Sequence, residues 1–481
     1  MSSVRRQRAR LALLGSAGVL VVAAVVAASR GGAPAPLPRP GLGRPAATGD
    51  PFAYRPGSES AFAARAASGE AQVLFSKSPG GALATAARVA ALRPLINAAT
   101  SGTSIDPVTL EGLVFVESAG RADALAGSDP SSAAGLTQIL AETGQSLLGM
   151  HIDLARSRTL TAAIGRAAAL GQAGVVARLE RRRAKVDDRF DPRRALAATV
   201  RYLELSANRF GRADLAVVSY HMGIGNLSNV LAAYDGGRPV PYAQLYFDSS
   251  PNRHSAAFAL LSGFGDDSSL YYWRVLGATN VMRLYRSDRR ALTRLSGLEA
   301  AHDSAEEVLH PPDRTESFAG PDALGAAYGS GSVLPLPSDA AALGLAYDGG
   351  LGSSAGSVGE PAALYRGLRP AAVDLLIELA ARVKALSGGA VPLIVAGAVQ
   401  DRRYQSQSGV ADPEAYDAYS LDTTGYAFEI RRRYASRAQA VALQAMLDRL
   451  QALNLIDWVR EPDVIHVTVA GDASQVIARG V

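Results

Sequence analysis

Cysteine is absent from the 481 residues, and this absence excludes several classes of site. Without a thiol the chain forms no internal disulfide, uses no thiolate nucleophile and builds no cysteine-based zinc site. A lipoprotein anchor, which needs an acylated cysteine, is excluded for the same reason. Aromatic residues are also scarce, at 6%, so small apolar residues supply much of the 48% hydrophobic fraction.

The chain also lacks a strong charge of one sign. Its 49 basic and 44 acidic residues leave a net charge of +5, over a length that suits two or three domains. No stripe of Lys and Arg interleaved with aromatic residues is present, so nucleic acid is not an expected partner. The mild positive balance is compatible with work near an anionic surface.

Residues 1–30 have the pattern of a signal anchor or a signal peptide. Four arginines between Arg5 and Arg10 precede an apolar run, 11–28, which reaches the short limit of a membrane span. Small-residue cleavage sites follow, so a cleaved signal fits almost equally well. The anchor is favoured because the run is long for a signal peptide. In either case we expect an exported protein of the cell envelope, tethered to the cytoplasmic membrane or secreted.

Composition divides the rest of the chain into four segments. Residues 31–79 are expected to be a Pro/Gly/Ala-rich spacer, and 80–290 a helical domain. Residues 291–362 are poor in long apolar side chains and predict a flexible linker. Residues 363–481 mix helical and strand patterns, which predicts a small α+β domain. The fold class is therefore multidomain, with an N-terminal membrane helix or signal.

One carboxylate stands out in the helical segment. Asp106 and Pro107 are typical of a helix start, and Gly120 of a helix end, which places Glu117 in the last turn among apolar residues. The negative helix end and the apolar surroundings both disfavour the ionised form and raise the pKa. A carboxyl group that stays protonated near neutral pH is suited to general acid catalysis.

Three sequence blocks strengthen this interpretation. They are Glu117-Ser118, then 134–139 (Ala-Gly-Leu-Thr-Gln-Ile), then 219–226 (Ser-Tyr-His-Met-Gly-Ile-Gly-Asn). In this order the blocks resemble the soluble lytic transglycosylase family across about residues 90–285. The resemblance implies an all-α, lysozyme-like domain in which Glu117 is the catalytic acid and no cofactor is needed. It implies that the substrate, peptidoglycan glycan strands, is held by Ser118, Gly135, Gln138, Tyr220, His221, Gly225 and Asn226.

This chain departs from the family in two positions and one insertion. Thr137 replaces a common Met, and His221 replaces a common Asn, which could alter how the sugar N-acetyl group is held. The insertion, about 150–189, contains the basic run 181–185. That run is interpreted either as a solvated helix face, which is favoured, or as a contact with anionic wall polymer. A hydrolytic muramidase and a non-catalytic peptidoglycan-binding scaffold remain the alternative functions.

A second group of residues lies in the C-terminal segment. Ser420 to Ile430 and Trp458 to His466 resemble a degenerate zinc D,D-peptidase (D-alanyl-D-alanine carboxypeptidase-like) domain. The resemblance maps metal ligands to Asp422, Glu429 and His466, and a contact with the carboxylate of the stem peptide to Arg402 or Arg403. Two carboxylates and one histidine form a harder, less zinc-selective set than the family uses. We therefore expect a domain that binds wall peptide, with at most a weakly bound divalent metal, and an unusual metal hydrolase is the alternative.

Overall fold

The computed structural model describes residues 49–265, 267–301, 305–389, 391–408 and 419–481. The expected signal segment, 1–30, and the first part of the expected spacer lie outside these ranges. Within them, no helix is both long enough and apolar enough to cross a membrane.

The described chain forms two compact units, and neither is continuous in sequence. One unit, here the helical unit, consists of Leu74–Tyr246 and Ala259–Gly297. The other, here the sheet unit, consists of the described part of Met1–Val73 together with Phe247–Phe258 and Leu298–Val481. The fold is mostly helical with one small sheet region, consistent with a lysozyme-like helical domain and a small α+β part.

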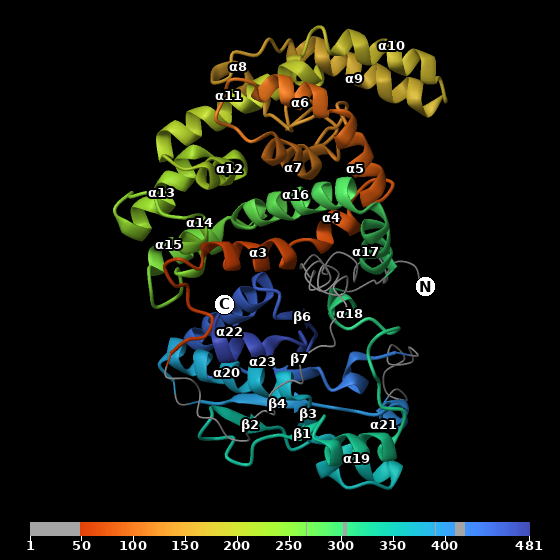
Figure 1. Ribbon diagram of the computed structural model, residues 1–481, viewed down its shortest axis with the longest axis vertical. Helices are drawn as coiled ribbons and strands as arrows, with labels where there is room; N and C mark the ends of the chain where they lie inside the picture. The colour runs from red at the N-terminus through yellow and green to blue at the C-terminus, as the bar shows by residue number, and fades with distance from the viewer. Residues whose placement is uncertain (1–48, 266, 302–304, 390, 409–418) are drawn as a thin grey trace. The chain divides into compact units, whose positions relative to one another are not determined.

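The helical unit contains helices that the apolar spacing predicted. Apolar spacing in the sequence predicts helices near 195–210 and 270–286, and these are α11 and α16 (Figure 1). The main elements of the unit are α5 (Ala82–Ala91), α6 (Arg93–Thr100), α7 (Pro107–Ser118), α8 (Ala141–Ser146), α9 (Leu154–Ala169), α10 (Ala173–Arg183), α11 (Pro192–Phe210), α12 (Ala213–Met222), α13 (Ile224–Asp235), α14 (Tyr242–Phe247), α15 (Ser255–Gly263), α16 (Tyr271–Ser287) and α17 (Arg289–Ala301).

Helices α7 and α16 pack closely because a glycine faces the contact. A Cβ atom added to Gly112 would lie 2.7 Å from both Thr279 Cγ2 and the Val275 carbonyl oxygen. One residue earlier, the fully buried Glu111 accepts from Arg286 at 2.7 Å and lies 2.9 Å from Arg93. A buried carboxylate is tolerated only when such partners compensate it. These contacts fix the helix that carries Glu117.

The sheet unit is built on five strands in the order β2-β4-β5-β7-β6. Strand β2 is parallel to β4, and the other neighbouring pairs are antiparallel. The sequence predicts strands at 464–469 and near 391–396, and these are β7 and β4. Elements of this sheet and its helices are β2 (Leu345–Tyr347), β4 (Leu393–Gly397), β5 (Ala427–Arg431), β6 (Ile456–Arg460), β7 (Val464–Val469), α20 (Pro370–Ser387), α21 (Arg402–Ser408), α22 (Arg437–Ala452) and α23 (Ala473–Arg479).

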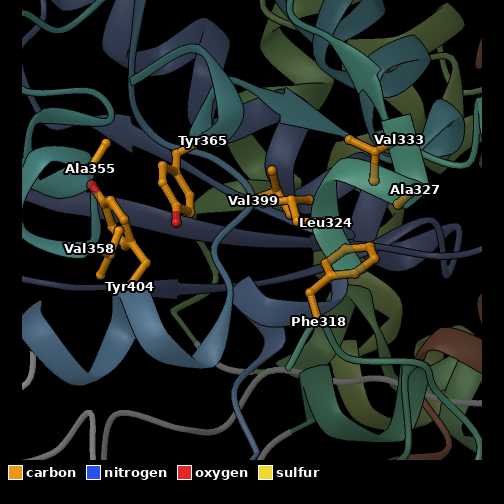
Figure 2. Packing of buried hydrophobic residues seen from close by; sticks show 9 residues of the cluster. All are labelled: Phe318, Leu324, Ala327, Val333, Ala355, Val358, Tyr365, Val399 and Tyr404. Atoms are coloured by element: carbon orange, nitrogen blue, oxygen red, sulfur yellow. The ribbon is translucent and has the colours of Figure 1, made fainter. Parts of the chain in front are cut away.

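The segment expected to be a flexible linker, 291–362, is instead largely folded. It contains most of α17, α18 (Ala305–Leu309), α19 (Pro321–Ser330), β1 (Leu334–Pro335) and β2. Figure 2 shows its apolar residues packed with three residues from later in the chain, Tyr365, Val399 and Tyr404. The long apolar side chains are few, but most are buried, Phe318 and Leu324 among them, and the others are partly buried. Composition alone therefore understated the order of this segment.

The expected spacer, 31–79, also differs from the structure where it is described. Residues 50–73 belong to the sheet unit and include α3 (Glu59–Gly69) and the first two residues of α4 (Gln72–Ser76). Phe62 is fully buried and its ring lies 4.8 Å from that of Phe247. Arg65 forms an ion pair with Asp472 at 3.1 Å. Alanine and glycine here allow close helix packing and do not indicate an extended chain.

Candidate active site

Glu117 lies in the last turn of α7, as the sequence predicted. The Asp106 side chain caps the helix start by accepting from the Val108 N–H at 2.9 Å, and Pro107 occupies the first turn. The helix ends one residue after Glu117, and Ala119 then adopts a left-handed conformation with φ of 55°. This strained end turns the chain away immediately behind the carboxylate.

Burial raises the pKa of Glu117 to about 7, while a hydrogen bond from Tyr271 opposes the rise. The Tyr271 hydroxyl donates to Glu117 Oε1 at 2.6 Å. Tyr271 begins α16 and is itself buried, so the two groups meet where α7 and α16 pack together. A carboxyl group with this pKa is partly protonated at neutral pH, as a general acid requires.

The sequence did not connect Tyr271 to Glu117. From the sequence alone, the aromatic residues of 271–273 are predicted to belong to the core, which is favoured, or to line a sugar groove. In the structure Tyr271 and Trp273 are both buried. The contact with Glu117 spans 154 positions. Helical spacing shows that Tyr271 faces inward, but it cannot show which polar group its hydroxyl meets.

Tyr220 joins the site from α12. Its hydroxyl donates to the Thr137 carbonyl at 2.7 Å and lies 3.3 Å from Thr199 Oγ1. Burial raises the pKa of Tyr220 strongly, and the charge of Glu117 adds to the rise. Tyr220 therefore remains a neutral donor. It fixes the segment that carries Gln138 relative to the helix bundle.

The segment 124–139, here named the catalytic loop, is a tight loop that follows Glu117 in the sequence. Isolated bridges pair Leu125 with Ala134, and Ala134 with Ile139. Gln138 has a φ of 50°, and its side-chain amide donates to the carbonyls of Gly135 at 2.8 Å and Ala124 at 3.2 Å. The amide N–H groups of Gln138, a residue expected to hold sugar, thus stabilise the loop. The side-chain oxygen of Gln138 is the group left to accept from a substrate hydroxyl.

Gly135 is required by a close backbone contact. A Cβ atom at this position would lie 1.8 Å from the carbonyl oxygen of Arg189, and φ is +79°. No side chain fits there. Gly135, the glycine of the second sequence block, therefore allows the loop to approach the Arg189 backbone. No larger residue could occupy this position and bind substrate.

Arg189 and Asp187 stabilise this loop, and the sequence alone does not point to either residue. Both side chains are fully buried and form an ion pair at 2.7 Å. Arg189 also donates to the carbonyls of Pro130, Ser132 and Ile139. One buried guanidinium thus satisfies three loop carbonyls. Within a basic, polar insertion, nothing in the sequence separates this arginine from the exposed ones.

His221 lies against the Tyr271 ring. The two rings stack with centroids 5.0 Å apart, and His221 Nδ1 is 2.9 Å from the Ser268 hydroxyl. His221 is solvent-exposed, and it contacts Tyr271, the residue that donates to Glu117.

The remaining predicted residues of the helical unit are placed differently. Ser118 is buried, and its hydroxyl bonds back to Val114 O at 3.3 Å. Gly225 and Asn226 are exposed in the first turn of α13, where the Asn226 amide donates to Met222 O at 2.9 Å. The structure thus joins Glu117, Gln138, Tyr220 and His221 through shared contacts, while Ser118 faces its own helix.

In the sheet unit, the three predicted metal ligands lie near one another. Glu429 and His466 are directly opposite in the β5–β7 register, and His466 Nε2 is 3.3 Å from Asp422 Oδ1. A fourth carboxylate, Glu306 of α18, lies 2.8 Å from His466 Nδ1. Glu306 was not foreseen, because its segment was expected to be a flexible linker.

These residues do not fit a metal ion as they are arranged. Burial lowers the pKa of His466, but Glu306 and Asp422 outweigh it and hold the pKa well above the usual range. The resulting imidazolium donates from both nitrogens and has no lone pair for a metal. Burial and the charge of Asp422 raise the pKa of Glu429 to about 7. No set of three or more His, Asp or Glu side chains in the described ranges is arranged to hold a metal ion.

Arg402 and Arg403 begin α21 in the same unit, and both are exposed. The Arg402 guanidinium donates to Ser317 Oγ at 2.7 Å. The neighbouring Asp401 is buried and caps the helix by accepting from the backbone N–H of Arg403 at 2.8 Å. The two guanidinium groups are thus presented at the surface, where they can meet an anionic group in solution.

Comparison with known proteins identifies one region. Residues 94–238 match the family model of the transglycosylase SLT domain. This match supports the lytic transglycosylase family and an enzyme that acts on peptidoglycan. It extends from α6 to just beyond α13 and contains Glu117, the loop with Gln138, and Tyr220. The D,D-peptidase resemblance of 363–481 is not supported by these comparisons. No curated protein and no solved structure matches the chain.

Proposed function

We propose that this protein is an exported peptidoglycan lytic transglycosylase that uses Glu117 as its single proton-transfer group. The bond cleaved is the one from N-acetylmuramic acid to N-acetylglucosamine. The observation that carries the proposal is the Glu117 carboxyl group, whose burial raises the pKa to about 7 within the region that matches the SLT domain. Export follows from the pattern of residues 1–30 and from the location of the substrate.

The Glu117 carboxyl group serves first as acid and then as base. Because Tyr271 donates to Oε1, Oε2 is the oxygen that carries the proton to the leaving glycosidic oxygen. The carboxylate left behind keeps the Tyr271 hydrogen bond, which stabilises it until it accepts a proton from the C6 hydroxyl of the muramic acid. That hydroxyl oxygen attacks the anomeric carbon and leaves a 1,6-anhydro end.

The surroundings of Glu117 favour this one-acid route over hydrolysis. Two-carboxylate glycosidases need a second carboxylate as nucleophile or to activate water. Burial and Tyr271 are the influences on the Glu117 pKa, and no other carboxyl group of the described residues is among them. Asp129, a nearby acid in sequence, is partly exposed and forms an ion pair with Arg158 at 2.8 Å.

Mass spectrometry of muropeptides tests the proposal directly. Purified sacculi digested with the protein should yield anhydro-muramic acid ends, and Glu117→Gln should yield none. Reducing ends would instead establish a hydrolytic muramidase. Absence of cleavage by a correctly folded protein would leave a peptidoglycan-binding scaffold.

The sheet unit is proposed to bind the stem peptides of the wall. The support is the surface presentation of Arg402 and Arg403, two guanidinium groups able to pair with a peptide carboxylate. Fluorescence anisotropy with a labelled stem pentapeptide should show weaker binding for Arg402→Gln/Arg403→Gln than for the exposed control pair Arg433→Gln/Arg437→Gln. Equal binding by the two variants would remove this role.

A further inference from the structure

Helices α9 and α10 form a hairpin within the helical unit. The two helices lie side by side and are drawn in yellow in Figure 1. The base of the hairpin is fixed to the catalytic loop region. Ser157 Oγ donates to Asp187 Oδ2 at 2.8 Å, and the buried Arg183 guanidinium lies 3.7 Å above the Phe190 ring. These contacts attach the base of the hairpin to the rest of the unit.

The hairpin concentrates the positive charge of the protein. Residues 154–185 contain eight Arg and Lys residues and one acidic residue, Glu180, an excess of seven positive charges. This excess is larger than the net charge of +5 for the whole chain. The rest of the protein is therefore slightly acidic in balance. A charge separated in this way creates a local positive field that the overall composition conceals.

Four of these basic residues lie on one face of α10 and its end. Arg178, Arg181 and Arg182 follow the spacing i, i+3 and i+4, which aligns side chains along a helix, and Lys185 follows two residues beyond the helix end. All four are exposed, and among the described residues none forms an ion pair with a carboxylate. We name them the α10 basic stripe.

The stripe has no evident role in stabilising its own helix. Like charges at these spacings repel one another. The helix dipole favours cations only in the last turn, and Arg178 lies outside that turn. Other arginines of this unit, such as Arg158 and Arg212, are paired with carboxylates. A row of like charges without ion pairs is therefore a surface that can bind an anionic partner.

We propose that the α10 basic stripe binds a linear polymer that carries phosphate groups. Three of its four side chains are arginines, whose planar guanidinium groups match phosphate oxygens in pairs. The three arginines extend over about 6 Å along the helix, and Lys185 follows in the next turn of the chain, a row that suits successive charges of one strand. The proposal goes beyond glycan cleavage and depends on the proposed function only in placing the protein where wall polymers occur.

A membrane surface fits the hairpin less well. Residues 154–185 contain no aromatic residue, and membrane-surface helices combine basic residues with a large apolar face. Leu170 is 71% exposed, but it lies in the turn before α10, eight residues from the first stripe residue. A phosphate polymer needs only the charges, and these are what the stripe provides.

Binding of labelled inorganic polyphosphate to the full chain in mild detergent tests the proposal. The stripe variant carries Gln at 178, 181, 182 and 185. The control carries Gln at four exposed arginines without an ion pair among the described residues, at 290, 294, 433 and 437, so that the change in net charge is the same. The stripe variant should bind on the order of tenfold more weakly and with a smaller salt dependence, because four charge-assisted contacts are lost. The control should bind like the unaltered protein.

Several results would overturn the proposal. Equal weakening in both variants would show that net charge alone attracts the polymer. Binding to anionic lipid vesicles in place of polyphosphate, lost in Leu170→Ser, would establish a membrane contact. If circular dichroism shows that the stripe variant is unfolded, the double variant Arg178→Gln/Arg182→Gln replaces it. An unchanged affinity of this double variant for polyphosphate would also overturn the proposal. Cleavage of polymer-free sacculi should be unchanged in the variants, which separates this test from that of the catalytic function.

Discussion

At the scale of single residues, the proton affinity of Glu117 is set by two opposed influences. Burial raises its pKa and the Tyr271 hydrogen bond lowers it, with a result of about 7. In Tyr271→Phe only the burial remains, so the pKa should rise further. We expect the alkaline limb of the pH–activity profile to move upward by about one pH unit.

The matched control for this prediction is Tyr272→Phe, on the same helix. Burial and the charge of Asp214 are the main influences that raise the pKa of Tyr272 to about 12, and Glu117 is not among them. The control should leave the alkaline limb where it is. A downward shift in Tyr271→Phe, or the same shift in both variants, would show that this hydrogen bond does not set the pKa of Glu117.

A second prediction concerns the energetic cost of keeping this acid. Because the folded protein raises the Glu117 pKa from 4.5 to about 7, the free energy of unfolding falls as pH rises between these values. Glu117→Gln should abolish cleavage and remove this loss. The free energy of unfolding of the variant minus that of the unaltered protein should therefore be about 1–3 kcal/mol larger at pH 8 than at pH 5. Melting temperatures at the two pH values provide the measurement, and an identical difference at both would contradict it.

How far the sequence determined the site depends on sequence distance. Glu117 could be placed because its helix signals, from Asp106 to Gly120, are local. Tyr271 could not be assigned, since its partner lies 154 positions away. Arg189 was missed for a different reason: burial, and not residue type, distinguishes it from the exposed arginines around it.

At the scale of elements, the catalytic loop depends on one close approach between Gly135 and the Arg189 backbone. Gly135→Ala would place a methyl group 1.8 Å from a carbonyl oxygen. We expect a loss of more than about 3 kcal/mol in the free energy of unfolding, together with loss of activity. Urea denaturation and sacculus turbidity measure the two effects.

Gly149→Ala is the matched control for Gly135→Ala. Gly149 also has a positive φ, of +62°, but no atom lies within 4 Å of an added Cβ. It should cost about 1 kcal/mol from backbone strain alone and leave cleavage intact. Equal losses in the two variants would show that φ, and not the contact with Arg189, is what requires glycine.

Elements with a clear apolar pattern were predicted, and short strands of mixed polarity were not. Helix α20 begins after Arg369 and ends before Gly388, as its apolar spacing and terminal glycine indicated. Strand β7 has the bounds that its β-branched residues predicted. Strands β5 and β6 were not identified, because five residues with mixed polarity do not differ from a loop until their neighbours pair with them.

At the scale of the whole molecule, the units are assembled from separated stretches of chain. Residues 247–258 and the helix α3 belong to the sheet unit, although both were expected outside it. A contiguous division by composition cannot find such an exchange. The same limit explains the linker: few apolar residues are enough when each is buried, as around Phe318.

The last prediction concerns the cluster around His466 in the sheet unit. Its pKa lies well above the ordinary value of 6.5, so the stabilising contribution of the imidazolium persists at pH 7 and is lost only as pH rises through the folded value. His466→Gln leaves the buried carboxylate of Glu306 without its cation. We expect a loss of about 2–4 kcal/mol at pH 7, measured by thermal denaturation of the full chain.

Zinc distinguishes this ion-pair cluster from a metal site. If His466 is held as an imidazolium by Glu306 and Asp422, excess zinc should leave the melting temperature of the unaltered protein unchanged, because a ligand stabilises only a state that it binds. Glu306→Gln frees Nδ1 and lowers the His466 pKa, so any affinity for zinc should appear first in that variant. A rise in melting temperature of the unaltered protein with zinc, abolished by His466→Gln, would show that these residues form a metal centre after all.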